Sequence, residues 1–84
     1  MYDRCLEALR WELRKRYRTQ LEFGSFKYVE VKLERGEIRH VLLANELPEE
    51  HIEGFIERWY EDGHLTRDDG QTVWIKPAFF QEEF

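Results

Sequence analysis

The sequence predicts an α+β fold in which a helix, a β-hairpin, a second helix and a second β-hairpin follow one another along the chain (αββαββ). Residues 2–18 and 47–62 repeat apolar residues every three or four positions, which is typical of amphipathic helices. Residues 21–44 change to a period of two, which is typical of strands, and Asp69-Gly70 marks a turn in a later apolar segment. We therefore expect a four-stranded, mostly antiparallel sheet with both helices packed on one face.

The length of 84 residues allows one domain, which we expect over residues 1–77. Residues 78–84 form a C-terminal tail that we expect to fold back onto the domain, since Phe79 and Phe80 would be unusual in solvent.

The single cysteine excludes an intramolecular disulfide and indicates a reducing compartment. The sequence shows no signal-peptide pattern and no apolar run of about 20 residues, so we expect a soluble, cytoplasmic protein.

The first helix is predicted from Asp3, a suitable N-cap, to about Arg18 or Thr19. Its apolar stripe consists of Tyr2, Leu6, Leu9, Leu13 and Tyr17. Cations gather in its last turns, where they favour the negative end of the helix dipole.

The first hairpin is predicted between residues 21 and 44. Its first strand places Val29, Val31 and Leu33 on one face. Gly36 supplies the reversal, and residues 38–44 form the return strand.

The second helix is predicted to begin at Pro48, which is tolerated in a first helical turn, and to stop at Gly63. Its apolar stripe is Ile52, Phe55, Ile56 and Trp59. The opposite face carries four acids, Glu50, Glu53, Glu57 and Glu61.

The second hairpin is predicted from residues 64–67 and 71–76. A two-residue loop would pair Leu65 with Trp74, whereas a three-residue loop with a left-handed Gly70 would pair Leu65 with Val73. We prefer the three-residue loop because it gives one apolar face. The core expected from all four elements is Leu6, Leu9, Leu13, Val29, Val31, Ile52, Phe55, Ile56, Trp59, Val73 and Ile75.

Residues 48–76 resemble the last helix and the wing of winged-helix DNA-binding domains. The features are a helix, Gly63-His64-Leu65, a short strand, Asp69-Gly70 and a second strand, and they cover about a third of the chain. The resemblance implies that this helix reads DNA, but its four acids would face phosphates. In addition, a hairpin pattern replaces the preceding helix of a helix-turn-helix, so the sequence does not predict that function.

Charge is unevenly distributed along the chain, whose net charge is −5. Residues 1–20 carry six Lys and Arg against three Asp and Glu, whereas residues 21–84 carry seven against fifteen. A phosphate-binding surface would therefore have to lie on the first helix. The balance of 18 acids and 13 bases in the whole chain does not favour DNA mimicry.

Trp11 is the candidate contact residue of the first helix. At about 100° per residue it projects roughly opposite the apolar stripe, on the side of the cations Arg4, Lys15 and Arg18. Because Trp and Arg are over-represented at interface hot spots, these residues predict a partner-binding face. Two alternatives stay open: the helix packs between two surfaces, or Trp11 only makes local cation–π contacts with Lys15.

A second candidate surface is the sheet face opposite the helices, where alternation places Phe26, Tyr28 and Trp74. An open sheet face with aromatic residues stacks bases or forms a dimer interface. The alternative is that the tail with Phe79 and Phe80 covers this face.

Catalytic chemistry is not indicated. Three histidines, one cysteine and Ser25 provide few ways to build a nucleophile, a base and an orienting group. Glu50-His51 lacks a second histidine four residues away, and a lone cysteine excludes a structural zinc cluster. We expect no enzymatic activity, no metal and no cofactor.

The sequence therefore predicts a non-enzymatic protein–protein interaction module, such as a small adaptor, regulator or inhibitor. One version is a homodimer in which the basic first helix of one copy meets the acidic second helix of the other. The alternative is a single-stranded nucleic-acid-binding domain that uses Trp11 and the first helix, or the aromatic sheet face. No membrane partner is expected.

Overall fold

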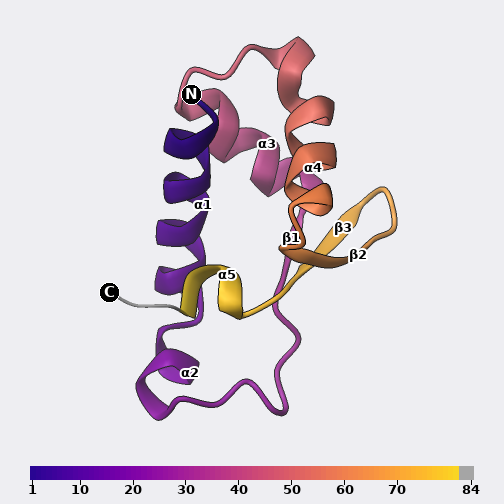
Figure 1. The fold of residues 1–84 in the computed structure, drawn as a ribbon. Helices are drawn as coiled ribbons and strands as arrows, with labels where there is room; N and C mark the ends of the chain where they lie inside the picture. The colour runs from indigo at the N-terminus through magenta and orange to yellow at the C-terminus, as the bar shows by residue number, and fades with distance from the viewer. Residues whose placement is uncertain (82–84) are drawn as a thin grey trace.

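The computed structural model describes residues 1–81, which form a small α+β fold with a three-stranded sheet rather than the expected four strands (Figure 1). In chain order the elements are α1 (Tyr2–Arg16), α2 (Arg18–Phe23), β1 (Lys32–Glu34), α3 (Arg35–Ala44), the 3₁₀ turn η1 (Glu49–His51), α4 (Ile52–Glu61), β2 (Leu65–Asp68), β3 (Thr72–Ile75) and α5 (Ala78–Gln81). The sheet order is β1-β3-β2, and both neighbouring pairs are antiparallel.

The predicted first strand is wrong over most of its length. The N-terminal helix ends at Arg16, Tyr17 leaves the helical conformation, and α2 occupies residues 18–23. Residues 24–31 then form a loop, so that only residues 32–34 pair with β3. Two of the alternating apolar residues, Val31 and Leu33, are nevertheless buried in the core.

The predicted return strand is also wrong, because residues 35–44 form α3. Ile38 and Leu42, one helical turn apart, are buried on its inner face. The side chain of Glu37 caps the helix by accepting a hydrogen bond from the backbone N–H of Glu34 at 2.9 Å. Gly36 therefore lies in the first turn of a helix and not in a tight reversal.

The second half of the chain follows its prediction more closely. The helix begins after Pro48 as η1 and continues as α4, which buries all four residues of its predicted stripe. The chain leaves α4 through Gly63, whose φ of +86° favours glycine.

The register of the second hairpin is wrong, although Leu65, Val73 and Ile75 share the buried face as expected. Leu65 pairs with Ile75, and Asp68 pairs with Val73. The turn lies one residue later than predicted, between Asp68 and Thr72, and the Asp69 carboxylate accepts hydrogen bonds there from the backbone N–H groups of Gln71 and Thr72. An irregularity between Leu65 and Arg67 then restores Leu65 to the inner face.

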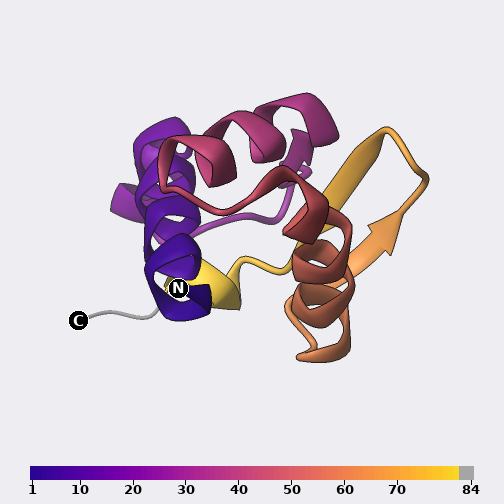
Figure 2. The same cartoon turned by 90° about the horizontal axis from the view of Figure 1, so that it is seen from above.

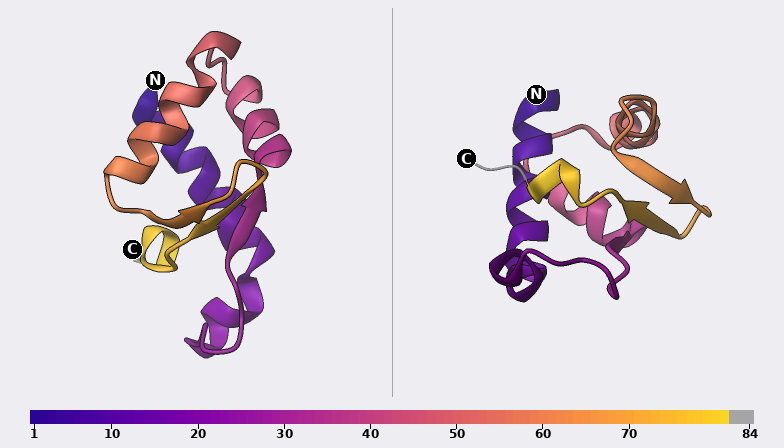
Figure 3. Two further views of the ribbon diagram at one scale, coloured as in Figure 1. Left: turned by 90° about the vertical axis from the view of Figure 1, so that its right-hand side faces the viewer. Right: turned by 60° about the horizontal axis from the view of Figure 1, so that its bottom comes forward.

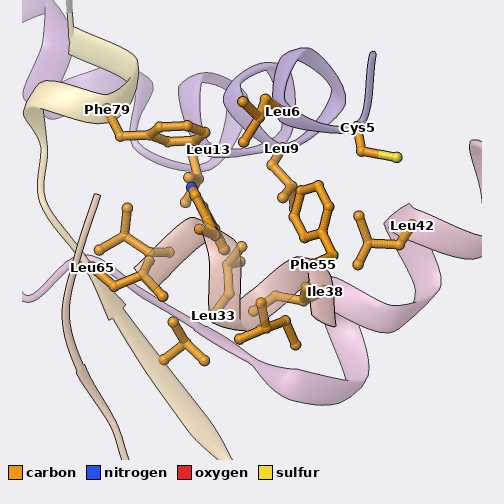
Figure 4. Packing of buried hydrophobic residues seen from close by; sticks show 14 of the residues in the cluster. Cys5, Leu6, Leu9, Leu13, Leu33, Ile38, Leu42, Phe55, Leu65 and Phe79 are labelled. Carbon is orange, nitrogen blue, oxygen red and sulfur yellow. The ribbon is translucent and has the colours of Figure 1, made fainter. Parts of the chain in front are cut away.

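The core lies between the helices and the inner face of the sheet (Figure 4). Of the expected core residues, all are buried except Val29, which is half-buried in the loop before β1. Further buried residues are Cys5, Leu33, Ile38, Leu42, Leu47, Leu65, Phe79 and Phe80. The two phenylalanines belong to α5, which packs against α1; residues 82–84 of the expected tail lie outside the described residues.

Residues 48–76 form the helix and the hairpin on which the resemblance to winged-helix domains rests. The four acids that count against DNA binding, Glu50 in η1 and Glu53, Glu57 and Glu61 in α4, are exposed.

Candidate interaction surfaces

Trp11 is 68% exposed in the middle of α1, on the side away from the buried leucines. It borders a groove of about 420 Å³ between α1 and α2. The lining residues, which define the Trp11 groove, are Trp11, Arg14, Lys15, Arg18 and Leu21. An exposed indole, an aliphatic side chain and three cations thus lie together on one surface.

The break between α1 and α2 creates the second wall of this groove, and contacts with distant residues hold the break in place. The backbone N–H of Lys32 donates a hydrogen bond to the Tyr17 hydroxyl at 3.1 Å. The Tyr17 ring lies 6.1 Å from the ring of Phe80 and 6.4 Å from that of Phe26, measured between centroids. Because Tyr17 is held against these groups, α2 leaves the axis of α1 and brings Leu21 to the groove.

The cations of the groove differ in their partners. Arg14 donates from Nε to the carbonyl oxygen of Phe80 at 3.0 Å, and Lys15 Nζ lies 3.6 Å from Glu12. Arg18 makes no hydrogen bond or ion pair within residues 1–81. A carboxylate or phosphate beside the indole would therefore find at least one cation whose charge no neighbouring acid in that range offsets.

The other sequence-predicted contact residues are dispersed. Arg4 lies outside the groove, with its guanidinium 3.7 Å from Glu46. Phe26 is half-buried and packs edge-on against Phe80 at 5.7 Å, whereas Tyr28 is 88% exposed in the loop. Trp74 is half-buried under the guanidinium of Arg67, which lies 3.7 Å from the ring centroid. The predicted sheet face of three aromatic residues does not form, since only Trp74 is on a strand.

Sequence reasoning missed a second concave surface, the α4–β2 cleft, with a volume of about 440 Å³. Its lining residues are Arg35, Glu53, Gly54, Ile56, Glu57, Tyr60 and Asp68. Three acids and one arginine make this surface acidic. The 47% exposed ring of Tyr60 adds an apolar part.

Arg35 organises the polar part of the cleft. Its guanidinium donates two hydrogen bonds to Asp68, at 2.7 and 3.3 Å, and lies 2.9 Å from both carboxylate oxygens of Glu53. The hydrogen bonds from Arg35 hold the pKa of the Asp68 carboxyl below its usual range and raise the pKa of Arg35. Glu57 has no such partner within the described part of the chain.

The signal that pointed to Arg35 is the spacing Glu34-x-x-Glu37, a pattern of acids typical of a helix N-terminus. This spacing favours a helix over residues 35–44 rather than a hairpin turn at Gly36, and it places Arg35 in the first turn of that helix.

Other kinds of site are not found. Within residues 1–81 no group of three or more histidine, cysteine, aspartate or glutamate side chains is placed to hold a metal ion. None of the described helices has the length and apolarity needed to cross a membrane. No family model, curated protein or solved structure matches the chain.

Proposed function

We propose that the protein is a non-enzymatic protein-interaction module whose Trp11 groove binds an acidic peptide segment with an apolar side chain. The observation that supports the proposal is the 68% exposure of Trp11 beside Arg18, a cation without a partner in the described residues. An apolar side chain would contact Trp11 and Leu21, and an adjacent carboxylate would contact Arg18 and Lys15.

The size of the exposed ring makes this surface energetically capable of binding. A Trp side chain buries about 150–250 Å² when covered, and about 100 Å² of further burial at 25 cal/mol/Å² is worth about 2.5 kcal/mol. That magnitude is typical of a hot-spot residue. Residues that already fill a packed surface in the free protein would not offer this gain.

A peptide is favoured over single-stranded nucleic acid by the distribution of charge. Binding a phosphate backbone requires several cations along a continuous track. Here Arg14 donates to Phe80, Lys15 lies beside Glu12, and residues 21–84 carry fifteen acids against seven bases. A short segment with one or two carboxylates matches the groove better than a polyanion does.

Selection from a displayed library of random peptides tests the proposal. We expect selected peptides to be enriched in Asp or Glu next to an aromatic or aliphatic residue, with binding weakened at least tenfold by Trp11→Ala and by Arg18→Ala. Tyr28→Ala is the matched control, because it removes an even more exposed aromatic residue outside the groove. Peptides without acids, or affinity unchanged by both groove variants, would contradict the proposal.

The nucleic-acid alternative is tested in the same assay with a fluorescent single-stranded oligonucleotide at low salt. We expect no saturable binding that depends on Trp11. Binding that weakens steeply with salt and is lost in Trp11→Ala would replace the peptide with a nucleic acid as the ligand.

A further inference from the structure

The Trp11 groove and the α4–β2 cleft have opposite charge and lie on opposite sides of the molecule. The Trp11 groove is formed by α1 and α2, whereas the α4–β2 cleft is formed by α4, β2 and Arg35 at the start of α3. Seen from above, α1 is at one side and α4 with the hairpin is at the other (Figure 2), and the right-hand view of Figure 3 shows the same separation. A single chain therefore cannot bring its own two surfaces together.

We infer that the partner of the Trp11 groove is the α4–β2 cleft of a second copy of this chain. This inference rests on the proposed function: the acidic segment that binds the groove is the exposed face of α4 in the second copy. In the pair, Lys15 and Arg18 of one copy face Glu57 in the cleft of the other copy and Glu61, which lies one helical turn further along α4 outside the cleft lining. Cations and acids without strong partners thus meet.

The apolar parts of the two surfaces are also complementary. Gly54 lies in the floor of the cleft, and an added Cβ there would meet no atom within 4 Å, so the backbone of α4 is open to a flat ring. Tyr60, six residues further along α4, is 47% exposed at the same cleft. The indole of Trp11 is the largest exposed ring on α1, and Gly54 and Tyr60 together offer it a surface.

Three exposed acids of η1 and α4 have no hydrogen-bond or ion-pair partner within residues 1–81: Glu50 in η1, and Glu57 and Glu61 in α4. Glu57 and Glu61 lie four residues apart, and a like-charge pair at this spacing weakens a helix by a few tenths of a kcal/mol. A cationic partner surface would remove that repulsion. Binding of a basic partner would therefore also stabilise α4.

Docking of two different surfaces is heterologous, so each added copy leaves one groove and one cleft free. Because the two surfaces lie on opposite sides, the assembly is an open chain rather than a closed dimer. Exposed charge pairs are screened by salt. We therefore expect self-association that grows with protein concentration at low ionic strength and is reversed by salt.

Two variants that each break one surface test this arrangement. Trp11→Ala with Arg18→Ala removes the groove, and Gly54→Leu with Glu57→Ala fills the cleft and removes its unpaired acid. By sedimentation velocity at low salt we expect wild-type species larger than dimers, monomers for each variant alone, and a 1:1 complex in the mixture. The complex forms because the groove-deficient copy keeps its cleft and the cleft-deficient copy keeps its groove.

Wild-type protein that stays monomeric at low salt and high concentration would overturn the inference, as would a mixture that forms no complex. The cleft-deficient variant also separates this inference from the proposed function, because its intact groove should still bind the selected acidic peptides. Peptide binding without self-association would refute only the second copy as partner. Circular dichroism of both variants provides the folding control, and Gly54→Ala replaces Gly54→Leu if the larger side chain unfolds α4.

Discussion

The two concave surfaces differ in what their charged residues do for the fold. In the α4–β2 cleft, Arg35 connects the start of α3 to β2 through Asp68 and to α4 through Glu53. In the Trp11 groove, Lys15 pairs within its own helix, and Arg18 pairs with no residue in the described range. The charged residues of this small domain thus fall into two groups. Some connect secondary-structure elements to one another, and others remain accessible to a binding partner.

Burial explains why the two sets differ in energy. The side chains of Arg35 and Asp68 are 24% and 18% exposed, so their pairing takes place largely out of water. The Lys15 side chain is 67% exposed, and its pair with Glu12 is screened by solvent. Removal of Arg35 should therefore affect stability, whereas changes at Lys15 and Arg18 should affect binding alone.

The largest expected effect is that of Arg35→Ala. The substitution leaves the carboxylate of Asp68 partly buried without its arginine, and we expect the free energy of unfolding to fall by about 2 kcal/mol. Urea denaturation followed by circular dichroism measures this. Arg39→Ala is the matched control, because it removes the ion pair of the same helix with Glu49 where both side chains are about half exposed or more, and it should cost less than 1 kcal/mol. Equal losses in the two variants would show that Arg35 has no special role.

The fold could be predicted where its signals are local. Pro48, the stripe from Ile52 to Trp59 and Gly63 determine α4 by themselves, and the structure has that helix in place. The segment 35–44 is different, because Ile38 to Leu43 fits either a strand or a helix. Two interactions of Glu37 stabilise the helix: its side chain caps the N-terminus, and it forms a 2.8 Å ion pair with Arg16 on α1. The ion pair is a tertiary contact, which local sequence signals do not show.

The candidate site could be predicted in part, for the same reason. Helical phase alone places Trp11, Lys15 and Arg18 away from the stripe of α1. The second wall of the groove, Leu21, depends on the break at Tyr17, which is held by residues near β1 and in α5. The α4–β2 cleft required both α3 and the register of the second hairpin, and neither was predicted correctly.

An intermediate effect is expected from pH. Because the pKa of Asp68 is lower in the folded protein than in the unfolded chain, its contribution to stability is present above about pH 4 and is lost as the pH falls through the folded value. Thermal unfolding between pH 7 and pH 2.5 should show this loss. Asp68→Asn should be less stable at pH 7 but should lose less stability on acidification. If the unfolding temperatures of the two proteins fall in parallel with pH, other carboxyls cause the acid sensitivity. Glu37, whose pKa is also lowered, would then be the next residue to replace.

The smallest expected effect is that of Trp11→Phe on stability. Because Trp11 is 68% exposed, losing the larger ring should change the free energy of unfolding by less than about 0.5 kcal/mol. The same variant should remove the tryptophan emission that acrylamide quenches most readily, since Trp59 is fully buried and Trp74 is half-buried. A loss above 1 kcal/mol with unchanged quenching would mean that Trp11 packs against the protein in solution. The groove would then be closed, and Trp11 would belong with Arg35 among the residues that hold the fold.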